Sequence, residues 1–409
     1  HFNLVDIYAL GGSGIGPFAP LSLTLAPDTA QWARDFLASH AGAQISWVAV
    51  QVGASDPMKA WRPELFGHTL AALSRQAPVG YVFIGTEEER KAIHLAQTTY
   101  RQQGGTAPLC DAVGKTSLPQ LAAVLSQCRL LLTNDTGPMH LAVGVGTPVI
   151  DLSVGHVDFR ETGPYGPGHW MVQPDLGCAP CGFDKVCFHH ACKDRLVPEQ
   201  IASLCLHVLA GAAFPQSITG ARIYRSYADE DGLGSTQLHA GREDSVIEWY
   251  GRFWRRFWFE EFTGRASQVP AHAEPAPDWA EALAVLEHLA PLAKKLVAKA
   301  EELVRLTTRH PLPVSALQQL QRDETSERQQ ILALSMNTPA TASLAVAMVR
   351  DTHNDDGSEL TELAQSRLGT YRRWHKRLQA VASRFRSFNR AQGLVRRAGS
   401  RPLPMVRST

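Results

Sequence analysis

The sequence lacks any long apolar run and any strong excess of charge. No stretch of the 409 residues approaches the roughly 18 to 20 apolar residues that a helix needs to cross a bilayer, and no signal peptide is visible. The 40 lysines and arginines nearly balance 39 acidic residues, so the formal net charge is +1. This balance predicts neither a nucleic-acid-binding protein nor an acidic solvating one. The hydrophobic content of 44% is enough for a packed core, and the length predicts two or three domains.

Cysteine is also scarce, with seven residues in the chain. So few cysteines do not make a secreted disulfide framework at this length, and a reducing compartment is expected. Three of them follow strand or helix patterns and are predicted to be core residues, namely Cys110, Cys128 and Cys205. The other four lie together at Cys178, Cys181, Cys187 and Cys192.

The cysteine cluster allows two interpretations. Four soft ligands within fifteen residues suit tetrahedral Zn²⁺ or iron, and His189 or His190 would be able to replace one thiol. Such a metal would be structural, because four protein ligands leave no open position for a substrate. The alternative is a set of reduced, half-buried thiols.

Strand-like and helix-like segments alternate from Ile45 to Ile150. Strands are predicted at 45–52, 80–85 and 129–132, and a last strand ends at Ile150. Helices are predicted at 64–76, 87–103 and 118–127. This alternation implies parallel strands joined by right-handed crossovers, which is a doubly wound α/β sheet. In such sheets ligands bind at the carboxyl ends of the strands.

Three loops follow these strands at the same edge, namely Gly53–Lys59, Gly85–Glu89 and Asn134–His140. The last loop leads into a helix, whose free N–H groups and dipole favour an anion. A lysine, acidic residues and a helix N-terminus together suit a nucleotide diphosphate. Each has an ordinary alternative when taken alone: a solvated lysine for Lys59 and a half-buried histidine for His140.

Two glycine-rich stretches resemble nucleotide-binding motifs without completing them. In a dinucleotide-binding motif the phosphate-binding helix would begin directly after the glycines Gly11–Gly16. Pro17 and Pro20 stand at that position, so a flexible loop or hinge is predicted instead. The segment 114–117 looks like the end of a P-loop. Leu109 stands where that motif needs its first glycine, so a helix-capping turn is predicted.

Four motifs follow one another along the first half of the chain, at Gly53–Trp61, Gly114–Leu118, Asn134–Ala142 and Thr162–His169. In this order they resemble glycosyltransferase family 9, the ADP-heptose:lipopolysaccharide heptosyltransferases of Gram-negative bacteria, and the resemblance covers roughly residues 1–211. It implies a GT-B architecture, in which two Rossmann-like domains face a cleft. This chain would hold the C-terminal, donor-binding half of that architecture, followed by an α-helical extension.

The donor-binding residues that the resemblance implies are Ser55, Lys59, Glu88, Glu89, Asp135, Thr136, Gly137 and His140. Lys59 would neutralise the diphosphate as it leaves the anomeric carbon, with no metal or other cofactor for catalysis. Glu88 or Glu89 would hold the ribose hydroxyls, and the loop from Asp135 to His140 would cradle the phosphates. The segment Asp151–His156 departs from the Phe-Gly-Pro-Thr type of the family, which leaves the sugar and the nucleotide base open.

The general base that inversion needs is not assigned in this chain. The resemblance places it near the start of the acceptor domain, and this chain would hold only the end of that domain. Asp6 is not given the role. Because the chain starts at His1 without a methionine, we expect a fragment that lacks most of the acceptor domain and that can be inactive alone.

The predicted organisation changes after residue 215. Residues 1–45 are interpreted as the end of the acceptor domain and a hinge, and residues 46–215 as the nucleotide-sugar-binding domain with its Cys-rich loop 178–192. Residues 216–276 are interpreted as a linker with an aromatic helix. A helical domain is predicted over 277–395 and a basic disordered tail over 396–409. The aromatic helix at 247–262 is predicted to pack against the sheet domain rather than to bind sugars or a membrane. Apolar residues with 3-4 spacing from Leu286 to Leu303 predict a helical hairpin or short coiled coil.

The end of the chain is basic. After Glu362 no acidic residue occurs, whereas eleven arginines and Lys376 do. For an enzyme with a glycolipid acceptor, attraction to anionic headgroups is the economical interpretation, at about 1 kcal/mol per basic group near the surface. No nucleic-acid partner is expected, and the predicted location is the cytoplasm with peripheral contact at the inner membrane.

Three functions are compatible with these features. The first is an inverting glycosyltransferase that moves heptose from ADP-heptose onto lipopolysaccharide core or a related bacterial glycan. The second is a catalytically incomplete protein that binds nucleotide sugars or acts as a scaffold. The third is a sugar-nucleotide epimerase, against which the order of the motifs argues.

Overall fold

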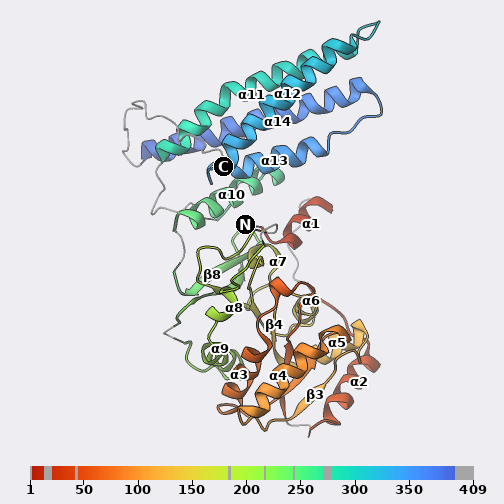
Figure 1. Cartoon of the computed structure of the whole chain (residues 1–409), viewed down its shortest axis with the longest axis vertical. Coiled ribbons are helices and arrows are strands. Elements are labelled where there is room, and N and C mark those ends of the chain that lie inside the picture. Colours follow the sequence, from red (N-terminus) through yellow and green to blue (C-terminus); the bar gives the residue numbers. More distant parts are fainter. Residues whose placement is uncertain are drawn as a thin grey trace. The chain divides into compact units, whose positions relative to one another are not determined.

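The computed structural model describes residues 2–12, 21–41, 45–182, 186–215, 218–242, 245–269 and 279–391 (Figure 1). The chain divides into two compact units. The first comprises His1–Asp244 and Arg255–Pro270, and the second comprises Ser245–Trp254 and Ala271–Thr409.

A twisted sheet forms the centre of the first unit. Among the described residues it has eight strands, which in spatial order are β3 (Leu109–Asp111), β2 (Val79–Ile84), β1 (Ser46–Gln51), β4 (Cys128–Thr133), β5 (Val149–Leu152), β6 (Trp170–Pro174), β7 (Ala221–Ala228) and β8 (Gly234–Ala240). The pairs from β3 to β6 are parallel, and β7 and β8 are antiparallel. The order of the first six strands is that of the doubly wound nucleotide-binding fold, so the predicted α/β class is confirmed.

Helices cover both faces of the sheet (Figure 1). Val48 and Val50 of β1 pack on one face with α3 (Pro63–Ser74), α4 (Arg90–Gln102) and α9 (Pro198–Ala210). Trp47 and Ala49 pack on the other face with α2 (Pro27–Ala38), α5 (Leu118–Ser126) and α6 (Gly137–Gly144). Successive residues of a strand point to opposite faces, so a strand that is buried on both sides is apolar throughout.

Short elements complete the first unit. They are α1 (Leu4–Gly12), η1 (Pro57–Lys59), η2 (Glu87–Glu89), α7 (Phe159–Thr162) and α8 (Cys192–Arg195). The predicted hinge at 11–16 begins at the end of α1, and its residues 13–16 lie outside the described residues. The three cysteines predicted as core residues are buried, which confirms that prediction.

Within the predicted linker region 216–276, the part before the aromatic helix is not a linker, because β7 and β8 extend the sheet there. These two strands form its antiparallel edge and carry Arg222, Arg225 and Gln237 among their apolar residues. An antiparallel edge exposes one face to solvent, so its strands keep polar residues and resemble a loop in composition. Within residues 1–45, which were interpreted as the end of the acceptor domain and a hinge, α2 buries Ala33 and Leu37 in the core of the sheet unit.

The second unit is helical, as predicted. It contains α11 (Trp279–Thr307), α12 (Val314–Met336), α13 (Ala342–His353) and α14 (Leu360–Ala391). The spaced apolar residues of α11, including Leu286, Leu289 and Leu296, are buried where α11 packs along α12 and α14. The predicted tail at 396–409 lies outside the described residues. No helix in the described part of the chain combines the length and the apolar character that crossing a membrane requires.

The aromatic helix α10 (Ser245–Thr263) is shared between the two units. All its aromatic residues except the exposed Phe262 are buried, as predicted for core residues, but the predicted partner is wrong for its first half. Phe253 stacks on Phe385 of α14, with 4.7 Å between the ring centroids, so this half belongs to the helical unit. From Arg255 onward the helix belongs to the sheet unit, where Arg255 pairs with Asp229.

Candidate functional site

The candidate site lies where the strand order reverses. The chain leaves β1 into η1 on one side of this point and leaves β4 into α6 on the other, because β1 and β4 are adjacent in the sheet. In doubly wound sheets the connections from such strands diverge to opposite faces and leave a crevice at the carboxyl edge. The loops after β1 and β4 therefore meet at the position that binds ligands in this fold class.

Lys59 and Asp135 form an ion pair across this crevice. The Lys59 Nζ lies 2.9 Å from Asp135 Oδ2, and the two side chains are 21% and 7% exposed. Thr162, at the end of α7, donates a hydrogen bond from its hydroxyl to the same carboxylate oxygen at 3.2 Å. Three segments that are distant in sequence thus hold one cation at the edge of the sheet.

The N-terminus of α6 opens onto the same place. Thr136 is its N-cap residue in an extended conformation, and its side chain does not cap the helix. At Gly137 an added Cβ would meet no atom within 4 Å, so the space beside this backbone is open. First-turn N–H groups and the positive end of the helix dipole favour an anion at such a position.

Asn134 fixes the two loops relative to each other. Its buried side-chain amide accepts a hydrogen bond from the backbone N–H of Trp61 at 2.9 Å and donates to the carbonyl oxygen of Val52 at 2.8 Å. A second donation reaches the carbonyl oxygen of Gly53 at 3.2 Å. One side chain therefore holds the loop after β1 against the loop after β4, and with it the position of Lys59.

The loop after β5 packs on the loop after β1. Gly155 adopts a left-handed backbone conformation with φ of 69°. A Cβ there would lie 2.2 Å from the carbonyl oxygen of Met58, so only glycine permits this approach. This loop belongs to the Asp151–His156 segment that departs from the family pattern, and its contact with η1 brings it into the site.

Asp151 lies fully buried at the end of β5. Burial, and after it the nearby carboxylate of Asp135, raises the pKa of its carboxyl group to about 8. Ser153 donates a hydrogen bond to Asp151 Oδ2 at 2.5 Å, whereas Oδ1 has no hydrogen-bond partner among the described residues. At neutral pH this carboxyl group therefore keeps its proton.

His140 is half-buried on α6. Burial lowers the pKa of its imidazole below the ordinary value, and the positive charge of Lys59 acts in the same direction, while Asp135 opposes both. A neutral imidazole near neutral pH follows, so His140 would offer hydrogen bonds rather than a positive charge.

Glu88 and Glu89 differ in what they contact. Glu89 Oε1 accepts a hydrogen bond from Gln51 at 2.8 Å, and Oε2 accepts one from the backbone N–H of Thr86 at 2.7 Å. Glu88 is exposed, and a hydrogen bond with Thr86 holds the pKa of its carboxyl group below the ordinary value. Glu89 thus stabilises the turn after β2, while Glu88 faces solvent. Ser55, in the loop after β1, is also exposed.

The cysteine segment lies beside the site. Lys193 donates from Nζ to the carbonyl oxygen of Pro57 at 2.5 Å, and the Trp61 indole donates to the carbonyl oxygen of Lys193 at 2.8 Å. Burial raises the pKa of the Cys181 thiol, and the other three cysteines of the cluster raise it further. Within the described residues no three His, Cys, Asp or Glu side chains are placed to hold a metal ion. The thiols as placed do not form a metal site, and metal binding stays a prediction.

The structure gathers Lys59, Asp135, His140 and the N-terminus of α6, all of which were predicted as site residues. Their roles in donor binding stay predictions. Sequence reasoning did not single out Asn134, Thr162 or Asp151 as site residues. The first two lie inside the quoted motifs, and Asp151 gives a signal of its own as an acidic residue within an apolar strand.

Residues 22–191 match the family described as glycosyltransferase family 9 (heptosyltransferase). This chain is therefore similar to family 9 over a segment that is less than half of its length. The family 9 segment contains both loops at the strand-order reversal and Thr162. The strands β7 and β8 and the helical unit lie beyond the match.

Curated relatives cover the same segment. Lipooligosaccharide heptosyltransferase 2 of Campylobacter jejuni is 27% identical over 154 residues, which are 37% of this chain and 47% of the relative. The lipopolysaccharide core heptosyltransferase OpsX of Haemophilus influenzae is 50% identical over 55 residues, which are 13% of this chain and 16% of the relative. The chain therefore spans less than half the length of these curated relatives.

A solved structure also resembles part of the chain. It is a glycosyl transferase family 9 protein from Veillonella parvula, with 27% sequence identity and a TM-score of 0.35. The similarity covers 40% of this chain and 47% of that one.

Proposed function

We propose that this chain carries the donor-binding half of an inverting glycosyltransferase, which moves heptose from ADP-heptose onto lipopolysaccharide core or a related bacterial glycan. The observation that carries the proposal is the Lys59–Asp135 ion pair beside the open N-terminus of α6. The match to family 9 and the heptosyltransferases among the relatives support the choice of reaction and sugar.

The chemistry requires a positive site for the leaving group. The acceptor hydroxyl oxygen bonds to the anomeric carbon while the bond from that carbon to the diphosphate oxygen breaks, so negative charge grows on the diphosphate. Lys59 and the first N–H groups of α6 stabilise this charge. An ammonium group has three N–H donors, and Asp135 accepts one hydrogen bond from Lys59, which leaves donors for phosphate oxygens.

Replacing Lys59 tests the assignment. In calorimetric titrations of the full chain with ADP-heptose and ADP, we expect Lys59→Ala to weaken binding roughly 10- to 100-fold, because a hydrogen bond to a charged group is lost. Lys91→Ala, at an exposed lysine of α4, is the matched control and should bind as the parent does. Equal binding by Lys59→Ala and the parent would refute the diphosphate site, and tighter binding of UDP-sugars than of ADP-heptose would refute the choice of donor.

A second candidate function is a nucleotide-sugar-binding protein without catalysis. It is compatible with the state of Asp6, whose carboxyl group is buried and engaged and so does not serve as a general base. Tyr165 donates a hydrogen bond to it, and the Gly234 N–H donates another at 3.1 Å. An assay with the full chain, ADP-heptose and a heptose-deficient lipopolysaccharide core distinguishes the two functions. Release of ADP that depends on the acceptor supports the transferase. Tight binding of ADP-heptose without release of ADP supports the second function.

The acceptor and the location are also proposals. A glycolipid acceptor would lie at the inner membrane, so we propose a cytoplasmic protein in peripheral contact with anionic lipid. Several arginines of α14 already pair with acidic residues of the helical unit, as in Arg372 with Glu301 and Arg377 with Asp351. The contact would therefore depend on the basic residues that follow α14.

A further inference from the structure

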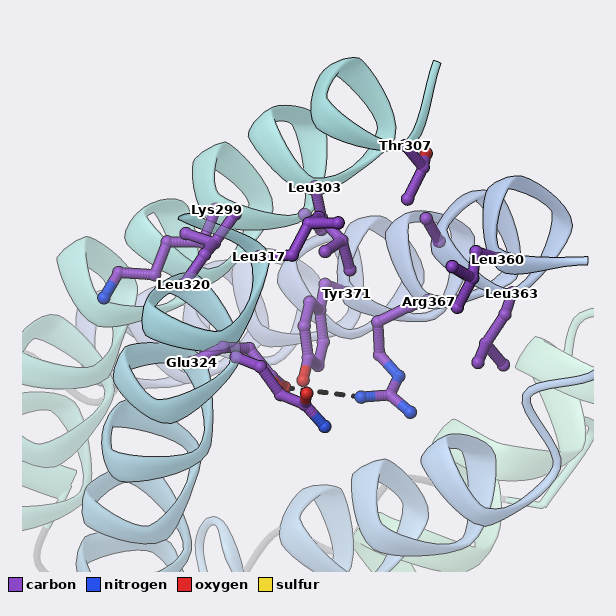
Figure 2. A pocket seen from close by; sticks show the side chains of 13 residues that line it. Lys299, Leu303, Thr307, Leu317, Leu320, Glu324, Leu360, Leu363, Arg367 and Tyr371 are labelled. Atoms are coloured by element: carbon purple, nitrogen blue, oxygen red, sulfur yellow. Dashed lines mark ion pairs between the residues drawn. The ribbon is translucent and has the colours of Figure 1, made fainter. Parts of the chain in front are cut away.

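The helical unit contains a cavity that the proposed function does not use. Its volume is about 180 Å³, and it lies between α11, α12 and α14 (Figure 2). Its walls are mainly leucine and alanine side chains, including Leu303 and Leu317. The exposed Leu360 and Leu363 also line it, so the cavity reaches the surface of the unit at the start of α14.

Two polar groups face this apolar space without complete hydrogen bonding. Tyr371 is fully buried, and its hydroxyl has no hydrogen-bond partner in the part of the chain that the structure describes. Glu324 is 8% exposed, and its Oε1 likewise makes no hydrogen bond among those residues. Figure 2 shows both groups at the same end of the cavity, where a dashed line marks the ion pair between Glu324 and Arg367. Buried polar groups usually have a partner, so this pair requires an explanation.

The neighbouring cations are already paired. Arg367 forms an ion pair with Asp355 and lies 3.6 Å from Glu324 Oε1, and Lys299 Nζ lies 3.2 Å from Glu327 Oε1. An anionic ligand would have to displace carboxylates from both cations. A cationic ligand would meet the same two positive charges. A neutral hydroxyl group would provide the Tyr371 hydroxyl with the hydrogen-bond partner that it lacks among the described residues, next to Glu324, whose Oε1 is ion-paired with Arg367 but accepts no hydrogen bond there.

We propose that this cavity is a binding site for a small neutral compound that carries a hydroxyl group on a ring or short alkyl group. The apolar part would lie against the leucines, and the hydroxyl would meet Tyr371 and Glu324. The size is suitable, because an engineered apolar cavity of about 150 Å³ in another protein binds benzene. This site is separate from the donor site and does not depend on the proposed function.

Phenol and benzene are matched probes, because they share a ring and differ by one hydroxyl. In calorimetric titrations of the full chain, we expect both to bind at one site and phenol to bind about two- to tenfold more tightly, as one hydrogen bond provides. Tyr371→Phe keeps the ring that packs in the core and removes only the hydroxyl. It should leave benzene binding unchanged and reduce the advantage of phenol.

Filling the cavity tests its location. Leu317→Trp enlarges a half-buried side chain of its wall and should weaken both probes at least tenfold. Leu334→Trp, at a half-buried position of the same helix outside the cavity, is the control and should bind as the parent does. Ala364→Val is a smaller filling variant in case the tryptophan disturbs folding, which circular dichroism would detect.

Three results would overturn the inference. They are absence of saturable binding by the parent, unchanged binding by folded Leu317→Trp and Ala364→Val, and equal affinities of the parent for phenol and benzene. A full phenol advantage in Tyr371→Phe would also overturn it, because the hydroxyl would then have another partner. Loss of donor binding by Lys59→Ala affects none of these measurements, so the two proposals fail independently.

Discussion

Lys59 and Asp135 are 76 residues apart in the sequence and 2.9 Å apart in the fold. Such a pair contributes little net stability, because removing two charges from water offsets much of their attraction. Its importance lies in position. Asp135, Thr162 and the Asn134 bridge hold the Lys59 ammonium at one place beside α6, so a diphosphate would meet a cation that is already ordered.

Gly137 gives a prediction that separates binding from stability. Its backbone does not need glycine, since its φ is not positive and a Cβ would meet no atom within 4 Å. Gly137→Ala should therefore fold as stably as the parent or up to about 1 kcal/mol more stably. The added methyl group would occupy the approach to the helix N–H groups, so we expect nucleotide affinity to fall at least tenfold.

Thermal unfolding and calorimetric titration with ADP measure the two effects. Gly177→Ala is the matched control, because that exposed glycine also has free space and lies outside the site. If Gly137→Ala bound ADP as tightly as Gly177→Ala, the phosphates would not lie against the start of α6.

Asp151 predicts a dependence of stability on pH. Its pKa is about 8 in the folded chain, against 3.8 ordinarily, so between these values the folded state binds more protons than the unfolded state. The free energy of unfolding therefore decreases as pH rises through this window and levels off above about pH 8. Asp151→Asn cannot titrate, so we expect a flatter curve.

The measurement is the midpoint of thermal unfolding between pH 6 and 8, where most other carboxylates are fully ionised. Asp323→Asn, at an exposed position of α12, should keep the slope of the parent. An Asp151→Asn curve as steep as that of the parent would contradict a proton held on this residue.

At the scale of elements, the loops after β1, β4 and β5 form one assembly. Asn134 joins the first two, Gly155 brings the third against Met58, and Lys193 joins the cysteine segment to Pro57. Each loop is short and has little core of its own, so these contacts determine its conformation. A change in one loop is expected to move the others.

The cysteine segment gives a prediction at this scale. A metal would close a loop that has few buried residues, and four thiols near one another favour Zn²⁺ or iron over free thiolates. We expect about one Zn²⁺ or iron per chain when the protein is purified without chelators, and we expect Cys181→Ser to lose it. Cys205→Ser, at a buried core cysteine, is the control for general destabilisation. If the purified parent protein contained no metal and all seven thiols could be titrated, the metal site would be refuted. The cluster would then be a set of reduced cysteines.

At the scale of the whole molecule, charge is distributed unevenly although the formal net charge is +1. The sheet unit carries the candidate donor site, and the helical unit carries most of the basic end of the chain. Within α14, arginines such as Arg372 and Arg377 are paired with acids. The arginines from 390 onward have no acidic residue near them in the sequence.

The proposed membrane contact follows from this distribution. We expect the full chain to bind vesicles that contain anionic phospholipid and not neutral vesicles, with binding that weakens as salt is added. Replacing Arg396 and Arg397 together by alanine should reduce the binding about tenfold or more, at roughly 1 kcal/mol per basic group. Arg372→Ala, at an arginine already paired with Glu301, is the control with a smaller effect. Equal binding to anionic and neutral vesicles would exclude the contact.

The sequence by itself determined the elements that have a strong internal pattern. Strands buried on both faces, such as β1 and β4, have mainly apolar residues, and the spaced apolar residues from Leu286 to Leu303 predicted the helix that is observed as α11. The loops at the carboxyl edge followed from the strand order that such alternation implies. These features depend on residues within one element, which a local pattern records.

Tertiary structure alone decided the features that depend on a distant partner. The strands β7 and β8 are defined by pairing with the edge of a sheet, and their own composition resembles a linker. The different surroundings of Glu88 and Glu89 depend on Gln51 and Thr86, and the Asn134 bridge depends on backbone groups of another loop. Asp151 keeps its proton because the fold buries it near Asp135, and the cavity in the helical unit exists because three helices leave a gap. Long-range packing sets each of these, and no local pattern encodes it.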